Sequence, residues 1–348
     1  MLLTSAQKPQ RDLPRLMFDG GSLVKSLRRQ TVLLSQTAPI KTEKLQIRSV
    51  NRILAPAWGI VLLASTVGLY ATGVRSASAL AMQVTLLLLL TTVFPISLYL
   101  RSTRHRYLYL SLSAIAWCLL STVGSWFCVT FIERIASATP LADGEFAQID
   151  AHLGIHVLAV HMWATKHRLG DFINYGYGLQ NWLVISAELL PIFLARVERV
   201  QRLNVAFLIT LLMSLPVVLM LPGIGPWYLY GFPSSEVQRF LEKSILDFRN
   251  SAGTTFLPIG VIVCPSYHVI LSLLSAWTLW GIRWLRVPVA LVALWIVMST
   301  LTSGMHYFID VLAGIAVTAA AIALSILITD RWQVGACPHV ENLPPRTA

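Results

Sequence analysis

The sequence predicts an all-helical (all-α) membrane protein, a polytopic bundle of about eight transmembrane helices. Apolar residues make up 55% of the 348 residues and charged residues only 12%, about half the charged share of a typical soluble domain. The mean hydropathy is +0.66, and several apolar stretches are long enough to cross the hydrocarbon core of a bilayer as helices. These observations exclude a soluble enzyme and a disordered chain.

Hydropathy and length define the expected spans. They are Ile53–Val74, Ala77–Leu100, Tyr107–Ile132, Phe172–Ala195, Leu203–Pro226, Ser266–Trp284, Val287–Thr302 and Tyr307–Thr329. A polar, basic segment over residues 1–52 precedes them and does not have the pattern of a signal peptide. We therefore expect this segment to stay in the cytoplasm.

The net charge of +11 indicates membrane orientation rather than nucleic-acid binding. Ten of the 27 Lys and Arg residues lie at or before Arg52. With the N-terminus inside, the inner segments carry 20 of these residues and the outer segments 7, which is the bias that orients bacterial-type membrane proteins. We expect a multi-pass protein of the cell (inner) membrane with both termini cytoplasmic and two long outer segments, Glu133–Asp171 and Tyr228–Pro265.

The first long outer segment has the pattern of an amphipathic helix. Apolar residues recur there at spacings of three and four: Phe146, Ile149, Leu153, Val157 and Val160. This spacing predicts a helix lying on the outer membrane surface, with Asp150 away from its apolar face.

Two histidines are expected at the outer surface, where two different spans begin. His268 follows the second long outer segment, and His306 precedes the last span with Asp310 four residues further on. Asp310 therefore lies on the same helix face as His306 and can fix its tautomer, leaving the other ring nitrogen as a nucleophile. His268 can supply and remove protons, and Ser266, with nearby backbone amides, can bind phosphate oxygens.

These residues resemble two of the three motifs of the type-2 phosphatidic acid phosphatase superfamily. Pro265-Ser266-Tyr267-His268 is similar to the second motif, and Ser299 with His306 and Asp310 is similar to the third. Tyr267 in place of the usual Gly resembles the branch that includes inositol phosphorylceramide synthases. The resemblance extends from about Asp143 to Thr329.

The resemblance implies a fold as well as a chemistry. It implies a six-helix catalytic core over residues 107–329. The two helices expected over 53–106 lie outside the resemblance, and the charge bias places a tail over 330–348 in the cytoplasm. In that chemistry His306 attacks phosphorus to form a phosphohistidine, Asp310 orients it, and His268 protonates the leaving group. No metal and no cofactor are required for this mechanism.

Phosphate binding is the part in which the sequence departs from the superfamily. Thr300 occupies the position of the third motif's Arg, and the first motif is reduced to Lys243, Arg249 and the following Asn250. The expected phosphate-binding residues are therefore Ser266, Arg249, Lys243 and Ser299, with Arg249 carrying most of the charge stabilisation.

The function expected from these residues is that of an integral membrane phosphatase. Its substrate would be a membrane lipid or lipid-linked phosphate, with water as the acceptor and no nucleic acid involved. The alternatives are a head-group phosphotransferase with an alcohol acceptor, a transporter and an inactive relative. Glu188, inside an apolar span, is expected to pair with a polar group of a neighbouring helix rather than to act in catalysis.

Overall fold

A computed structural model describes residues 39–72, 106–232, 235–250 and 262–334. The expected span Ala77–Leu100 lies outside these residues. The chain divides into two units, Met1–Lys44 and Leu45–Ala348, and the contacts given below belong to the second unit.

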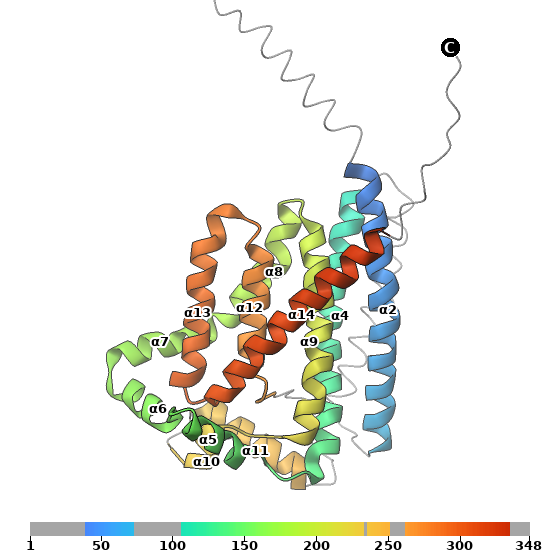
Figure 1. Ribbon diagram of the computed structural model, residues 1–348. Helices are drawn as coiled ribbons and strands as arrows, with labels where there is room; N and C mark the ends of the chain where they lie inside the picture. The colour runs from blue at the N-terminus through green and yellow to red at the C-terminus, as the bar shows by residue number, and fades with distance from the viewer. Residues whose placement is uncertain (1–38, 73–105, 233–234, 251–261, 335–348) are drawn as a thin grey trace, which may run out of the picture. The chain divides into compact units, whose positions relative to one another are not determined.

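Every regular element in the described residues is helical, as the sequence predicts (Figure 1). In chain order they are α2 (Pro39–Ala71), α4 (Arg106–Ile135), the 3₁₀ turn η1 (Ala136–Ala138), α5 (Asp143–His152), α6 (Val157–Lys166), α7 (Arg168–Gly178), α8 (Gln180–Phe193), α9 (Val197–Met220), α10 (Pro226–Tyr230), α11 (Glu236–Asn250), α12 (Tyr267–Leu279), η2 (Arg283–Leu285), α13 (Arg286–Thr302) and α14 (Phe308–Val334).

The described residues contain five helices that are long and apolar enough to cross a membrane, rather than the eight expected over the whole chain. They are Leu54–Ala71, Leu108–Ala138, Val197–Met220, Arg283–Thr302 and Phe308–Asp330. The expected span Ser266–Trp284 is represented by α12, an apolar helix of only 13 residues. The chain is thus a multi-pass membrane protein, with fewer full-length spans in the described residues than hydropathy alone predicts.

The prediction of one span over Phe172–Ala195 is wrong, because this segment forms two helices, α7 and α8, that meet at Leu179. Gly176 lies in α7 near this junction, and glycine weakens a helix interior. A Cβ at Gly176 would lie 2.5 Å from the Trp295 ring of α13, and the Trp295 indole donates to the Phe172 carbonyl at 3.0 Å. Packing against α13 therefore turns α7 away from the direction of α8.

Helix α9 joins the two main apolar clusters of the bundle. Leu208 and Leu211 pack with α2 and α4, whereas Leu203 and Ala206 pack with α8, α12 and α13. A helix buried on both sides is the expected centre of a bundle. Helices α12 and α14, which carry His268 and Asp310, both contact α9 and each other.

One end of the bundle carries the short helices α5, α6, α10 and α11 (Figure 1). The single surface helix expected over Phe146–Val160 is wrong, since α5 ends at His152 and α6 begins at Val157. Gly154 lies between them with φ at +74°, a conformation that favours glycine. This break lets α5 pack its own face against the start of α14.

Candidate active site

His306 lies in the short connection between α13 and α14, and its ring orientation is set by acceptors. Its Nδ1 lies 3.1 Å from the Val263 carbonyl oxygen and 3.7 Å from Oδ2 of Asp310. Because a carbonyl oxygen only accepts, Nδ1 carries the proton of the neutral ring. The lone pair is then on Nε2, the form in which an imidazole acts as a nucleophile.

Asp310 connects the beginnings of α14 and α12. Its side chain is fully buried, and its Oδ2 accepts the Tyr307 amide at 2.8 Å. Its backbone carbonyl accepts the Ser266 amide at 2.9 Å. The prediction that Asp310 lies beside His306 agrees with this geometry, although the carbonyl of Val263 makes the shorter contact.

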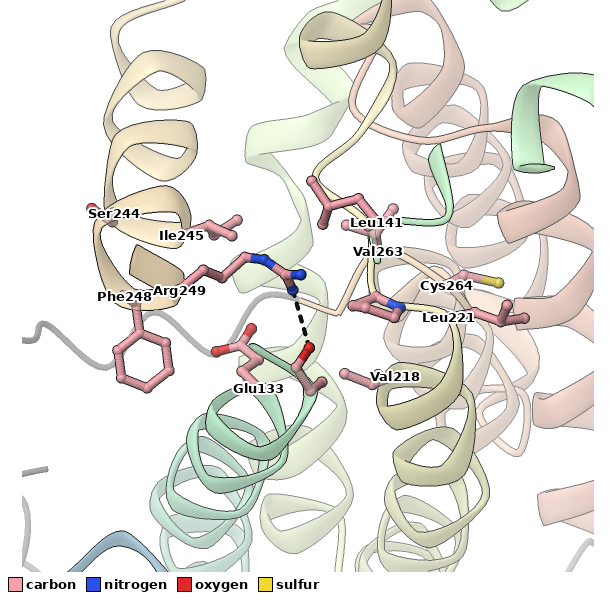
Figure 2. A pocket seen from close by; sticks show the side chains of 13 residues that line it. Glu133, Leu141, Val218, Leu221, Ser244, Ile245, Phe248, Arg249, Val263 and Cys264 are labelled. Atoms are coloured by element: carbon pink, nitrogen blue, oxygen red, sulfur yellow. Dashed lines mark hydrogen bonds between the residues drawn. The ribbon is translucent and has the colours of Figure 1, made fainter. Parts of the chain in front are cut away.

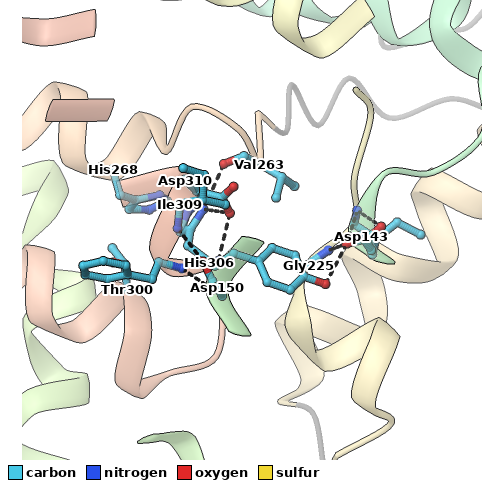
Figure 3. A network of polar contacts seen from close by, with 12 residues as sticks. Asp143, Asp150, Gly225, Val263, His268, Thr300, His306, Ile309 and Asp310 are labelled. Carbon is cyan, nitrogen blue, oxygen red and sulfur yellow. Dashed lines mark hydrogen bonds and ion pairs between the residues drawn. The ribbon is translucent and has the colours of Figure 1, made fainter. Parts of the chain in front are cut away.

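The structure brings His268 next to His306, as the topology predicts (Figure 3). The two ring centroids are 5.7 Å apart with an interplanar angle of 58°. Tyr177 of α7 stacks on His268 with a centroid distance of 4.1 Å, and its hydroxyl lies 3.2 Å from His268 Nδ1. Tyr177 is a contact that the sequence did not indicate, because it comes from a segment expected to be a single span.

The two serines of the predicted phosphate site differ in their hydrogen bonding. Ser266 is fully buried and its hydroxyl has no hydrogen-bond partner among the described residues. Ser299 is also buried, but its hydroxyl donates to the Ile296 carbonyl of its own helix at 2.6 Å. Ser266 is therefore the hydroxyl that is available to a ligand, whereas the hydroxyl of Ser299 is already bonded.

Thr300, which stands where the superfamily has Arg, is also turned toward its own helix. Its hydroxyl donates to the Val297 carbonyl at 2.7 Å. Its carbonyl oxygen accepts the amides of Met305 and His306, each at 3.2 Å. Thr300 thus shapes the connection that carries His306 and adds no positive charge.

Arg249 lies in the wall of a pocket at this end of the bundle (Figure 2). Its guanidinium donates to the carbonyls of Ala136, at 3.2 Å, and of Thr139. Val263 and Cys264 line the same pocket, and Val263 also bonds to His306. Within the described residues, no hydrogen bond or ion pair links Arg249 to the histidines.

Lys243, the second expected cation, is exposed on α11. It lies six residues before Arg249 on the same helix. Both cations therefore belong to α11, whereas the histidines belong to the α12–α14 side of the site.

Sequence reasoning missed the role of Asp150. The residue is buried, and its two carboxylate oxygens accept the amides of Phe308 and Ile309 at 2.7 and 2.8 Å. It thereby caps the N-terminus of α14, where a negative charge is favourable. Burial raises the pKa of this carboxyl, and the two amide donors act in the opposite direction.

Asp143 lies seven residues before Asp150 on α5 and binds Tyr307, the residue that follows His306. Its Oδ1 accepts the Tyr307 hydroxyl at 3.1 Å and the Gly225 amide at 2.7 Å, and its Oδ2 accepts the Ile224 amide at 3.0 Å (Figure 3). Burial raises the pKa of Asp143, while these donors lower it. The spacing of seven residues, which puts two acids on one helix face, was the available signal.

Two more side chains bond to the connection before His306. His161 Nδ1 of α6 lies 3.0 Å from the Thr302 carbonyl, and Gln238 of α11 donates to the Ser303 carbonyl at 3.2 Å. The nucleophile is therefore held by residues of α5, α6 and α11 as well as by its own helices.

Glu188 pairs with a neighbouring helix, as expected. It lies on α8, and its carboxyl interacts with the side chain of Cys118 of α4. In the described part of the chain, no group of three or more His, Cys, Asp or Glu residues has an arrangement able to hold a metal ion.

The fold and the site define a multi-pass helical membrane protein with a histidine pair and a buried carboxylate at one end of its bundle. A sequence model of the PAP2 superfamily matches residues 144–324, just over half of the chain. The chain therefore belongs to the PAP2 superfamily, whose members are generally metal-independent phosphatases, and membership is consistent with lipid phosphate phosphatase activity. Comparison with curated proteins and with solved structures gave no match.

Proposed function

We propose that this protein is a membrane phosphatase that hydrolyses a lipid or lipid-linked phosphate through a phosphohistidine at His306. The observation that carries the proposal is the bond between His306 Nδ1 and the Val263 carbonyl, because it leaves Nε2 with the lone pair. Asp310, within 3.7 Å of the same nitrogen, stabilises the positive charge that develops on the ring during attack.

The first step breaks the ester bond. Nε2 of His306 forms a bond to phosphorus, and the bond from phosphorus to the lipid oxygen breaks. His268, with its ring 5.7 Å from that of His306, donates a proton to the departing oxygen. The products are the lipid alcohol and a phosphohistidine.

The second step returns the enzyme to its starting state. His268, now neutral, removes a proton from water as the water oxygen bonds to phosphorus. The bond between Nε2 and phosphorus breaks, and inorganic phosphate leaves. No metal enters either step, so activity should persist in EDTA.

Phosphate charge is stabilised by the buried Ser266 hydroxyl and the cations of α11, and Ser299 would join them only by giving up its bond to the Ile296 carbonyl. Arg249 would exchange its carbonyl partners at Ala136 and Thr139 for phosphate oxygens when substrate binds. Lys243 contributes longer-range attraction. Arginine suits this role because its planar guanidinium matches phosphate geometry and remains charged.

The membrane placement follows the charge bias of the sequence. We propose that both termini are cytoplasmic and that the His306 end of the bundle faces the outer side of the cell membrane. A lipid can then enter laterally while water reaches phosphorus from outside. The catalytic core would run over residues 107–329, with added helices over 53–106 and tails over 1–52 and 330–348.

A second candidate is a head-group phosphotransferase related to inositol phosphorylceramide synthases. Tyr267, in place of Gly in the second motif, favours it. In that reaction an alcohol replaces water in the second step, and all other roles are unchanged.

The test measures phosphate release from a panel of lipid phosphates by purified protein in detergent with EDTA. We expect His306→Ala to lower the rate by about a thousandfold or more, as loss of a nucleophile does. His152→Ala, which removes an exposed histidine of α5, is the matched control and should keep full activity. Acid-labile phosphate bound to the wild-type protein after quenching should be missing from His306→Ala.

Equal rates for the wild type and His306→Ala would refute the histidine mechanism. A wild type that releases no phosphate but transfers the phosphoryl-containing head group to an added alcohol would select the transferase. A wild type without either activity would favour a transporter or an inactive relative.

A further inference from the structure

Three arginines gather at the end of α12 that is far from His268. Arg196 donates to the Gly281 carbonyl, Arg199 to the Thr278 carbonyl at 3.2 Å and Arg286 to the Trp280 carbonyl at 2.9 Å. We refer to Arg196, Arg199 and Arg286 as the arginine cluster. The side chains come from the beginnings of α9 and α13 and meet at the turn that ends α12.

The arginine cluster lies at the opposite end of α12 from the histidine site. Helix α12 has 13 residues, which separates its two ends by about 20 Å at 1.5 Å per residue. In Figure 1 the α8–α9 and α12–α13 connections lie at the end of the bundle away from α5, α10 and α11. Both connections adjoin helices of membrane-spanning length, so the cluster belongs at head-group level.

Capping of α12 accounts for only part of this charge. The C-terminus of a helix carries the equivalent of about half a negative charge, against three guanidinium groups. Glu198 lies close enough to Arg199 for an electrostatic attraction, but in the described residues no member of the cluster forms an ion pair with a carboxylate, and the neighbouring Arg202 pairs with Asp330. Each guanidinium has five N–H donors and uses one in the bonds above, so most donors remain available to an anion.

The surroundings of the arginine cluster favour an amphiphilic anion. Trp280 and Trp284 are 48% and 69% exposed beside it, and Arg286 lies over the Trp280 ring at 6.0 Å. Exposed tryptophans are typical of the membrane interface. Phe193 and Val287, close in the chain to Arg196 and Arg286, are also exposed and can contact acyl chains.

We propose that the arginine cluster binds the phosphate group of an anionic phospholipid in the leaflet opposite the histidine site. The phosphate would replace water around the guanidinium groups through charge-assisted hydrogen bonds, and the acyl chains would lie along the exposed apolar residues. This site is independent of the catalytic proposal, because it shares no residue with it and requires no turnover.

The test compares thermal stability of the purified protein in mixed micelles of phosphatidylcholine with and without phosphatidylglycerol. Arg196→Gln/Arg286→Gln removes two exposed charges of the arginine cluster and keeps Arg199, which packs against Gly281. Lys166→Gln/Arg168→Gln removes two exposed charges elsewhere and is the matched control. Loss of helix capping lowers stability in both micelles, so the lipid effect is the difference between them.

We expect phosphatidylglycerol to raise the melting temperature of the wild type and of the control. The effect should be lost in Arg196→Gln/Arg286→Gln, whose affinity for the lipid should fall by about thirtyfold at about 1 kcal/mol for each arginine. Stabilisation by inorganic phosphate at the same ionic strength that equals that by phosphatidylglycerol and is lost in Arg196→Gln/Arg286→Gln would overturn a lipid site in favour of a soluble anion, because phosphate bound at the histidine site does not depend on these two arginines. Equal losses in both double variants, or no effect on the wild type, would also overturn the proposal.

Discussion

The two sides of the candidate active site are held in different ways. On the nucleophile side, the connection that carries His306 bonds to buried residues of several helices, among them Asp150, Asp143 and His161. On the phosphate side, the Arg249 guanidinium donates to the backbone carbonyls of Ala136 in η1 and of Thr139. His306 is therefore already oriented for attack before any substrate is present. Arg249 must exchange its carbonyl partners for phosphate oxygens before it can stabilise the phosphate charge.

This difference separates two physical requirements of phosphoryl transfer. A nucleophile needs a fixed tautomer and a fixed position, which buried hydrogen bonds supply in advance. Charge stabilisation needs cations near the phosphate oxygens, and a long arginine side chain can reach them on binding. The substitution of Thr300 for Arg removes a positive charge from the phosphate side, whereas the backbone carbonyl of Thr300 still accepts the His306 amide on the nucleophile side. We therefore expect the two sides to respond differently to mutation.

The largest effect in this comparison is expected at Arg249. Arg249→Gln removes the main cation of the phosphate side, and loss of one charged donor should lower kcat/KM by about a few hundredfold. Lys243→Gln, on the exposed face of the same helix, should lower kcat/KM by only about threefold, since exposed charges are screened. The rate of phosphate release, measured at saturating and at limiting substrate concentrations, gives kcat and kcat/KM for each variant.

The competing outcome at Arg249 is a structural one. If Arg249→Gln lowers the melting temperature while kcat/KM stays within twofold, the guanidinium only fastens α11 to η1. The phosphate side would then depend on Ser266 and backbone amides.

The next effect tests the nucleophile side through Asp150. Asp150→Ala leaves two partly buried amides of α14 without acceptors, which should reduce the free energy of unfolding by about 2 kcal/mol. The resulting displacement of His306 should lower kcat by about a hundredfold with little change in KM. Denaturation in detergent and steady-state kinetics measure the two quantities.

Two variants of the same helix control for this result. Glu145→Ala removes an exposed acid of α5 and should change neither quantity. Asp150→Asn keeps one acceptor oxygen and should recover part of kcat. A kcat for Asp150→Ala equal to that of the wild type would show that α14 alone positions His306.

The sequence was sufficient to predict the helical class and the meeting of His268 with His306. Both conclusions follow from features that can be read locally in the sequence. These features are the lengths of the apolar segments and the position of each histidine at the end of a span. Asp310 could be placed beside His306 for the same reason, because a spacing of four residues puts both on one helix face.

The remaining features depend on partners distant in the chain. Asp150 was expected away from the apolar face of a surface helix, yet its amide partners lie 158 and 159 residues further on. The break between α7 and α8 depends on how Trp295 packs against Gly176. Periodicity reports which residues share a face but not what that face contacts, so neither feature was predictable.

A smaller effect is expected within the histidine side, at Gly314, where α14 contacts α12. A Cβ there would lie 2.9 Å from the Ser266 carbonyl oxygen and 3.1 Å from Cβ of Val269, so α12 and α14 must separate. Gly314→Ala should cost about 1–3 kcal/mol of stability and lower kcat about tenfold as His268 moves from His306. Gly144→Ala, where a Cβ meets nothing within 4 Å, is the control, and unchanged kinetics in Gly314→Ala would mean that the histidine spacing tolerates this shift.

The smallest effect should come from Tyr177, whose hydroxyl is a partner of His268 Nδ1. The hydroxyl can donate to the neutral ring and accept from the protonated one, so it supports both forms that the proposed mechanism uses. Tyr177→Phe keeps the stacked ring and removes only this bond, and kcat should fall about threefold with KM unchanged. Tyr175→Phe changes an exposed tyrosine of the same helix and should leave kcat unaltered. If both variants match the wild type across the pH profile of kcat, His268 is positioned by ring stacking and by α12 alone. Hydrogen bonds would then fix His306 in advance of substrate binding but not His268.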